Sequence, residues 1–329
     1  MYARKWLSCK LLVATVLVLT ATLAQGAGLR AIDIPADAGG PALKGAIWSP
    51  CSQPPGEVDF GKLILPGIKD CPLPGEKLPL IVVSHGRRGN FLGHIDTAQA
   101  LADVGFIVAA INHPGDTGSD LSRTDDLSVY VSRPNDIKRL IDFMVGASAV
   151  ASSVDRERIG LFGFSRGGYT ALAVIGANPD WSIVTQLCQQ STTHVCEQIR
   201  AKEFPAQPVT HDPRIKAAVI ADPLTVFFTP VSFAAVGIPV QLWASELGGD
   251  GVLPHTADIV DKNLPSKHEY HVIPNAGHFA FLAPCPPALA KEVPQICVDA
   301  NGFDRAAFHR QFNADMLAFF RMQLTNAPQ

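Results

Sequence analysis

Short runs of apolar residues recur along the chain and alternate with segments whose apolar residues repeat at helical spacing. Such uninterrupted runs predict strands that are buried on both faces, as in a parallel sheet. The predicted strands are 80–83, 106–111, 159–162, 215–221, 239–245 and 268–273. The predicted helices cover 95–104 and 133–144, a segment that begins at about residue 166, and 303–324. This alternation predicts an α/β fold, with a mostly parallel central sheet covered by helices on both faces.

Three parts of the chain depart from this alternation. Residues 29–34 and 43–48 are strand-like and flank a turn signal at 37–41, so we expect an antiparallel hairpin at the sheet edge. Proline and glycine crowd residues 50–79, which predicts a surface loop. Residues 178–212 are long and irregular, and such segments usually have a function or are disordered. We expect an insert there that either reaches over the sheet as a small cap or remains a surface excursion.

The composition indicates one globular domain. Of the 329 residues, 47% are hydrophobic and 17% are charged, so a large core is available and disorder is not expected. We expect a single domain over residues 27–329. The net charge of -3 and the absence of Lys/Arg runs argue against a nucleic-acid partner.

Residues 1–26 resemble a leader. Arg4 and Lys5 precede an apolar run at 11–23, and small residues follow as far as Ala27. The run is too short for a comfortable membrane span, which favours a cleaved secretory signal peptide over an uncleaved anchor. We therefore expect a periplasmic or secreted protein with no stable membrane anchor after cleavage.

The cysteines fit an exported protein. Cleavage of the leader removes Cys9 and leaves an even number, which favours disulfides in an oxidising compartment. We expect neighbours in the sequence to pair, because each pair brackets a loop that a cross-link would restrain. The expected pairs are Cys51–Cys71, Cys188–Cys196 and Cys285–Cys297. A metal site is not expected, because these cysteines lack C-x-x-C spacing.

The strongest chemical signal is Ser165, in the pattern Gly163-Phe-Ser-Arg-Gly167 between a predicted strand and a predicted helix. In that context G-x-S-x-G predicts a sharp turn that raises the hydroxyl above the sheet edge. Glycines suit this turn because side chains there would collide with neighbouring backbone. The turn also directs the first N–H groups of the helix at the same spot, so the Arg166 N–H is a candidate oxyanion donor.

A second oxyanion donor is expected from the loop after the strand at 80–83. Loops at the carboxyl ends of parallel strands carry the sites of α/β proteins, and the backbone N–H of Arg87 is the candidate here. The neighbouring His85 is expected to bond loop backbone rather than act as a base.

A serine hydroxyl needs a general base, and the base needs a carboxylate that fixes its tautomer. His278 is the predicted base, because it lies on a glycine-bearing loop after the last strand; His255 is the rival. Asp250, after the strand at 239–245, is the first choice for the acid. Asp222 and Glu246 remain alternatives.

With these residues in place, the chain resembles the α/β-hydrolase superfamily from about residue 78 to its C-terminal helix. Within it the chain is most similar to bacterial predicted dienelactone hydrolases and to the group of platelet-activating-factor acetylhydrolases and polyester hydrolases. The resemblance rests on Ser84-His-Gly-Arg, Asn112-His-Pro-Gly-Asp, Gly163-Phe-Ser-Arg-Gly-Gly and Asn275-Ala-Gly-His-Phe.

The resemblance implies a serine carboxylic-ester hydrolase that forms an acyl-enzyme on a small-molecule ester and needs no metal or organic cofactor. Dienelactone hydrolases proper use a cysteine nucleophile, so Ser165 argues against that named reaction. Acetylhydrolase-like relatives favour Asp222 as the acid, and polyester-hydrolase-like relatives favour Asp250. Two other hypotheses stay open: a serine peptidase of the same fold, and a non-catalytic binding protein on a hydrolase fold.

Overall fold

The computed structural model describes residues 27–59, 64–73, 77–300 and 302–325. They form a ten-stranded sheet in the order β10-β9-β8-β7-β5-β6-β2-β1-β4-β3. The strands are β1 Gly28–Ile34, β2 Leu43–Ser49, β3 Gly56–Asp59, β4 Ile64–Lys69, β5 Leu78–Ser84, β6 Ile107–Ile111, β7 Val154–Phe164, β8 Ile215–Ala221, β9 Val240–Ser245 and β10 His268–Ile273. Strands β5 to β10 pair in parallel, as predicted. The predicted signal peptide lies outside the described residues.

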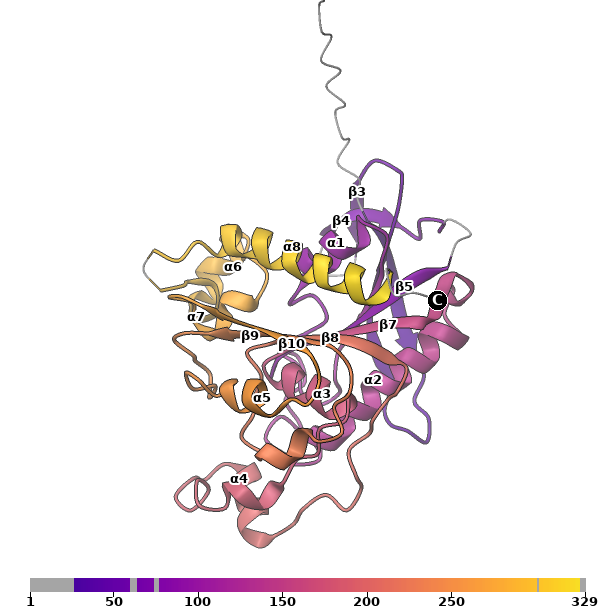
Figure 1. Ribbon diagram of the computed structural model, residues 1–329. Helices are drawn as coiled ribbons and strands as arrows, with labels where there is room; N and C mark the ends of the chain where they lie inside the picture. The colour runs from indigo at the N-terminus through magenta and orange to yellow at the C-terminus, as the bar shows by residue number, and fades with distance from the viewer. Residues whose placement is uncertain (1–26, 60–63, 74–76, 301, 326–329) are drawn as a thin grey trace, which may run out of the picture.

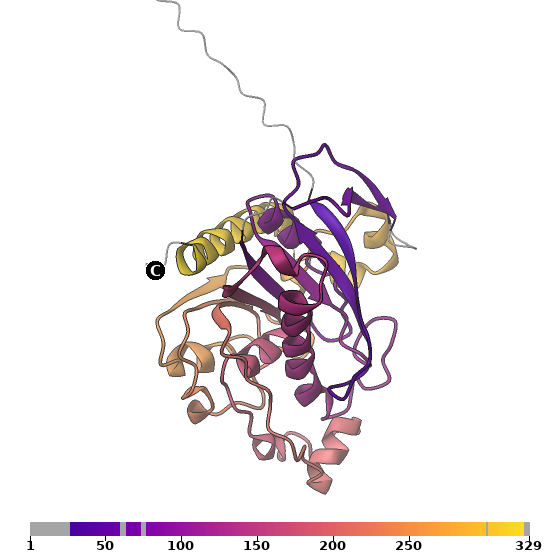
Figure 2. The ribbon, with the colours of Figure 1, turned by 90° about the vertical axis from the view of Figure 1, so that its right-hand side faces the viewer.

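Helices cover both faces of the sheet. They are α1 Ile95–Ala102, α2 Val129–Gly146, α3 Arg166–Val174, α4 His194–Ala201, α5 Asp258–Asn263, α6 Pro287–Glu292, α7 Pro294–Cys297 and α8 Arg305–Leu324. Figure 1 shows α1 and α8 on one face and α2, α3 and α5 on the other. In the side view of Figure 2 the segment around α4 extends below the sheet, far from α8.

The two helical layers explain why the strand runs are continuously apolar. In β5, Leu80 and Val82 belong to the core under α2 and α3, whereas Ile81 and Val83 belong to the core under α1 and α8. Both sets are buried, so successive residues from Leu80 to Val83 are all apolar. The mostly parallel, doubly covered sheet is therefore confirmed.

Helix α2 begins one turn earlier than predicted and carries Pro134 inside it. Proline has no N–H to donate to the carbonyl four residues before it, which here is that of Tyr130. The Tyr169 hydroxyl, from α3, donates to this carbonyl at 3.3 Å. The side-chain bond compensates for the missing helical one and lets the helix run through the proline.

The predicted antiparallel hairpin is confirmed as β1 and β2, but its predicted place at the sheet edge was wrong, because β4 and β3 extend the sheet beyond β1. The prediction of a loop over 50–79 was wrong in part, because β3 and β4 form a second antiparallel hairpin there. Strand β4 pairs in parallel with β1 and so extends the sheet.

All three predicted disulfides are present: Cys51–Cys71, Cys188–Cys196 and Cys285–Cys297. The second lies in the insert after α3, and the third joins the segments around α6 and α7. Disulfides of this kind form in oxidising compartments. Of the helices in the described ranges, none combines the length and the apolarity needed to cross a bilayer.

Candidate active site

Ser165 lies at the turn from β7 into α3 in a strained conformation, with φ 57° and ψ -120°. A side chain at Gly163 would collide with the carbonyl of Gly167, and one at Gly167 would collide with that of Ser84. The glycines therefore let β7, α3 and the end of β5 approach closely enough to hold the turn. The Ser165 N–H donates to the carbonyl of Ala221 at 2.9 Å, which fixes the turn against β8.

His278 lies beside this serine, as predicted. Its Nε2 is 2.9 Å from Ser165 Oγ, although 113 residues separate the two in the chain. The ring stacks on Phe164 with the centroids 4.7 Å apart, and it is only 2% exposed. The aromatic packing and the burial restrict the imidazole to an orientation that faces the hydroxyl.

The structure corrects the choice of carboxylate: Asp222, and not Asp250, lies against His278. His278 Nδ1 is 2.5 Å from Asp222 Oδ2. Asp222 follows β8, the strand next to β7, and its backbone N–H donates to Trp243. Its two oxygens also accept from the N–H and the hydroxyl of Ser245, at 2.8 and 2.7 Å. The carboxylate is thus held by several donors and is 2% exposed.

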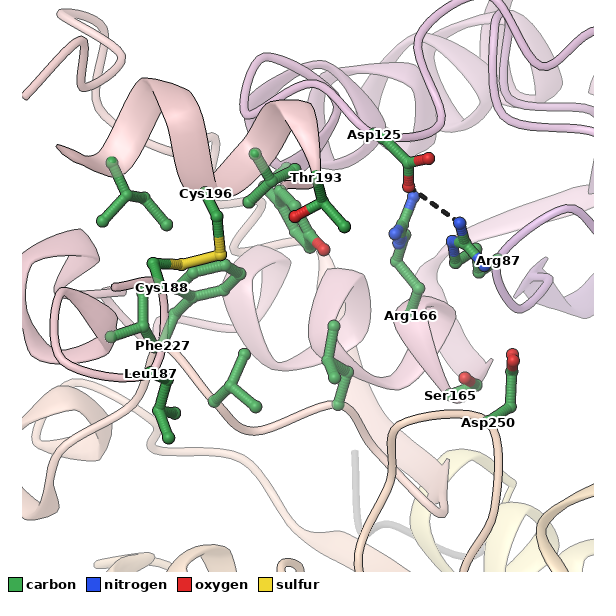
Figure 3. Close-up of a pocket in the computed structure, with 16 residues that line it drawn as sticks. Arg87, Asp125, Ser165, Arg166, Leu187, Cys188, Thr193, Cys196, Phe227 and Asp250 are labelled. Carbon is green, nitrogen blue, oxygen red and sulfur yellow. Dashed lines mark hydrogen bonds and ion pairs between the residues drawn. A yellow bond between two sulfur atoms is a disulfide. The ribbon is translucent and has the colours of Figure 1, made fainter. Parts of the chain in front are cut away.

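The loop that carries Asp250 and Glu246 has a different place. The carbonyl of Gly248 accepts from the N–H of His278 at 2.8 Å, and Glu246 Oε2 accepts from the N–H of Asn275 at 2.7 Å. This loop therefore supports both ends of the histidine turn through its backbone and through Glu246. Asp250 is exposed at its tip, near Ser165 (Figure 3).

Arg87 and Arg166, the predicted sources of the oxyanion donors, line the same cavity as Ser165. A Cβ added to Gly86 would be 3.2 Å from the Cβ of Ser165, so the backbone leading to Arg87 passes directly beside the serine. Arg166 is the first residue of α3, whose N-terminus carries partial positive charge. Among the described residues, neither the Arg87 nor the Arg166 N–H has a backbone acceptor.

A buried carboxylate joins the two segments that carry these N–H groups. Asp116 Oδ2 accepts from Arg166 at 2.9 Å and from Arg133 at 2.6 Å, and Oδ1 lies 3.3 Å from the N–H of Arg88. Burial alone would raise the pKa of Asp116, but the charges of the two guanidinium groups outweigh it and lower that pKa. No local pattern in the sequence predicts that these residues meet, because they lie on separate elements.

His85 has the structural role expected of it. Its Nδ1 is 2.7 Å from the carbonyl of Gly86, and its Nε2 accepts from the N–H of His113 at 3.1 Å. His113 in turn bridges Ser84 Oγ and Asp136, each at 3.0 Å. This second serine, histidine and aspartate chain is almost completely buried, so it braces the loop after β5 and offers no access to a substrate. Within the described ranges, no group of three or more His, Cys, Asp or Glu residues is arranged to hold a metal ion.

Two cavities open on Ser165. One, of about 320 Å³, extends under the insert and is shown in Figure 3. The other, of about 510 Å³, extends toward α6 and α7. Ser165, Arg87 and Asp250 line both, so the serine stands between them.

Burial gives two histidines near the site unusual titration. It lowers the pKa of His85 to about 3, with help from the charge of Arg133, and lowers that of His94 to about 4. The pKa values of both histidines are lower in the folded protein than in the unfolded chain. At a pH between the two values, the unfolded chain therefore binds more protons than the folded protein. The stability from the neutral rings is present above about pH 6.5 and is lost as the pH falls toward the folded values.

We therefore expect acidification from pH 7 to pH 5 to lower the free energy of unfolding, by about 2 kcal/mol for each of these histidines. Asp136, whose pKa burial raises to about 7, acts in the opposite direction. A His94→Phe variant removes the contribution of one histidine and leaves that of Asp136 unchanged, so it measures the effect of His94 alone. Urea unfolding at both pH values should show that this variant loses about 2 kcal/mol less than the wild type. An equal loss in both proteins would contradict the assignment.

Comparison with known proteins agrees with this architecture. The model of the prolyl oligopeptidase family matches residues 94–184, which include the Ser165 turn but less than half of the chain. No curated protein matches the sequence.

Solved structures match over almost the whole chain. A ferulic acid esterase from Streptomyces cinnamoneus aligns with a TM-score of 0.66 at 18% identity, covering 95% of this chain and 94% of that one. An acylaminoacyl peptidase from Pyrococcus horikoshii aligns with a TM-score of 0.56 at 15% identity, covering 93% of this chain but 43% of the peptidase. The sheet order, the serine turn and these likenesses together show that this chain has the α/β-hydrolase fold that its sequence resembles.

Proposed function

We propose that this protein is a serine carboxylic-ester hydrolase that acts on a small-molecule ester. The observation that carries the proposal is the continuous hydrogen-bonded chain from Ser165 through His278 to Asp222. This is the arrangement that makes a serine hydroxyl nucleophilic at neutral pH. It requires no metal or organic cofactor.

The steps follow from the geometry. His278 Nε2 takes the proton of Ser165 as its Oγ attacks the ester carbonyl, while Asp222 holds the Nδ1–H and stabilises the imidazolium. The backbone N–H groups of Arg87 and Arg166 stabilise the oxyanion, each by about 3 kcal/mol in typical sites. The imidazolium then gives its proton to the leaving alcohol. Water activated by His278 finally hydrolyses the acyl-enzyme.

Ester substrates are favoured over peptides by the extent of the structural matches. The esterase matches over nearly its whole length, whereas more than half of the acylaminoacyl peptidase has no counterpart here. We further propose that the protein is exported, because its disulfides need an oxidising compartment.

The test combines labelling with substrate choice. A fluorophosphonate should modify Ser165, as mapped by peptide mass spectrometry, and the Ser165→Ala variant should stay unlabelled. The wild type should hydrolyse nitrophenyl acyl esters and leave peptide anilides intact. Turnover of the anilides alone would show a peptidase, and a wild type that is neither labelled nor active would favour a binding protein.

A further inference from the structure

The two cavities differ in their access to the general acid. His278 lines the cavity toward α6 and α7, together with Phe279, but it does not line the cavity under the insert. In acyl transfer the imidazolium must reach the oxygen of the leaving alcohol. The alcohol must therefore leave on the side where His278 is open to the cavity.

We propose that the acyl group of the substrate binds in the cavity under the insert, which we call the acyl chamber, and that the alcohol group binds in the other, the alcohol-side cavity. This inference rests on the proposed function and adds to it an assignment of the two halves of the ester. The carbonyl carbon then lies between the cavities at Ser165, close to the N–H groups of Arg87 and Arg166.

The lining of the acyl chamber indicates the chemistry of its occupant. Away from Ser165 most of its lining residues are apolar, and they come from the insert and from the segment after β8. The insert contributes Leu187, Val195 and the Cys188–Cys196 disulfide, and the segment after β8 contributes Val226 and Phe227, which lies near the disulfide in Figure 3. An apolar group gains free energy by leaving water for such a surface.

The two arginines of the acyl chamber, Arg87 and Arg166, already have partners. The guanidinium of Arg87 is 2.7 Å from Asp125, and that of Arg166 bonds Asp116 and lies 4.9 Å from the centre of the Tyr130 ring. They offer no unpaired charge for an acidic acyl group. The volume of about 320 Å³ is at the small end of the usual range for ligand pockets, about 300–1,000 Å³. The acyl group is therefore apolar and small, the size of one aromatic ring or a chain of medium length.

The outer wall of the acyl chamber depends on the insert disulfide. Cys196 belongs to α4, and its bond to Cys188 ties this short helix to the irregular segment that precedes it. Gln198 gives a second tie by accepting from the N–H of Leu127 at 2.8 Å. Arg200 of α4 also donates to the carbonyls of Cys188 and Ser191. Without the disulfide only these hydrogen bonds would hold α4 to that segment, so the wall of the acyl chamber would loosen.

A matched pair of substitutions tests the assignment. Val226→Phe fills the acyl chamber, and Val293→Phe makes the same change in the alcohol-side cavity. For nitrophenyl esters, Val226→Phe should lower the ratio of kcat/KM for octanoyl over acetyl at least tenfold, about the effect of a lost methylene site. Val293→Phe should keep that ratio and instead reduce turnover of acetyl esters of bulky alcohols. Val195→Phe, on the insert wall, repeats the first test should Val226→Phe fold poorly.

Deacylation gives an independent reading, because the alcohol has already left the acyl-enzyme. Pre-steady-state bursts should show slower hydrolysis of the longer acyl-enzymes in Val226→Phe and wild-type rates in Val293→Phe. The opposite pattern, with Val293→Phe controlling the acyl ratio and deacylation, would overturn the assignment. A wild type without turnover or labelling would defeat the proposed function itself, which is a different result.

The disulfides provide a second comparison. The paired Cys188→Ala and Cys196→Ala substitutions should raise the octanoyl to acetyl ratio several-fold by opening the outer wall. The paired Cys51→Ala and Cys71→Ala substitutions, at the far edge of the sheet, should keep the wild-type ratio. An equal change of the ratio in both double variants would count against a role of the insert in acyl selection.

Discussion

Replacing Asp222 with asparagine is expected to lower kcat for a nitrophenyl ester by about 10⁴-fold. The carboxylate accepts the Nδ1–H of His278 and keeps Nε2 free to receive the serine proton. An asparagine amide has only one oxygen, and the N–H and the hydroxyl of Ser245 would compete with His278 for it. The amide can also present its NH₂ to the ring, which favours the tautomer with the proton on Nε2 and blocks proton transfer.

Asp250→Asn is the matched control for this prediction. Asp250→Asn removes the same charge close to Ser165, but Asp250 is exposed, and the carboxylate bonded to His278 is that of Asp222. Steady-state kinetics should show a far smaller loss of kcat than in Asp222→Asn. Thermal unfolding of both variants should establish that the folded state persists. If Asp250→Asn lost the activity and Asp222→Asn kept it, the acid would belong to the loop after β9.

The fold could be predicted because its strands are apolar on both faces. Leu80–Val83 of β5 and all five residues of β6 are buried and aliphatic, which gives each strand a continuous apolar run. Strands β3 and β4 escaped prediction for the opposite reason. They alternate buried and exposed residues over a few positions, and Pro66 and Gly67 interrupt the second. The pairing of β4 with β1 joins segments that are far apart in the chain, and the local pattern does not reveal it.

The candidate site was predictable where local structure defines it. The glycines around Ser165 and the glycine-bearing loop of His278 are both recognisable in the local sequence. Their order in the chain, serine before histidine, is the order expected for a catalytic pair in this fold. The carboxylate that bonds His278 could not be predicted, because Asp222 and Asp250 both follow strands whose carboxyl ends lie at the same edge of the sheet. Only the neighbouring position of β8 beside β7, and the bonds from Ser245, distinguish them. Asp116 was missed as a contributor because its partners come from α2 and α3.

Removing the charge of Asp116 is expected to destabilise the protein strongly. Its side chain is fully buried between Arg133 and Arg166, which are 0% and 4% exposed. An Asp116→Asn variant would remove the one carboxylate that forms ion pairs with both buried guanidinium groups. Breaking a buried ion pair in this way typically costs about 3–5 kcal/mol. The same variant should slow acylation, because the segments that carry the Arg87 and Arg166 N–H groups would lose their common anchor.

Asp125→Asn provides the control, since Asp125 also pairs with an arginine near Ser165. That pair, with Arg87, is at the surface, with the carboxylate 51% and the guanidinium 30% exposed. Exposed pairs contribute about 0–1 kcal/mol. Urea unfolding with the disulfides intact should therefore show a large loss for Asp116→Asn and almost none for Asp125→Asn. Comparable losses of unfolding free energy in the two variants would mean that burial does not determine how much the Asp116 cluster contributes to stability. The proposed anchoring of the Arg87 and Arg166 segments by this cluster would then have no energetic basis.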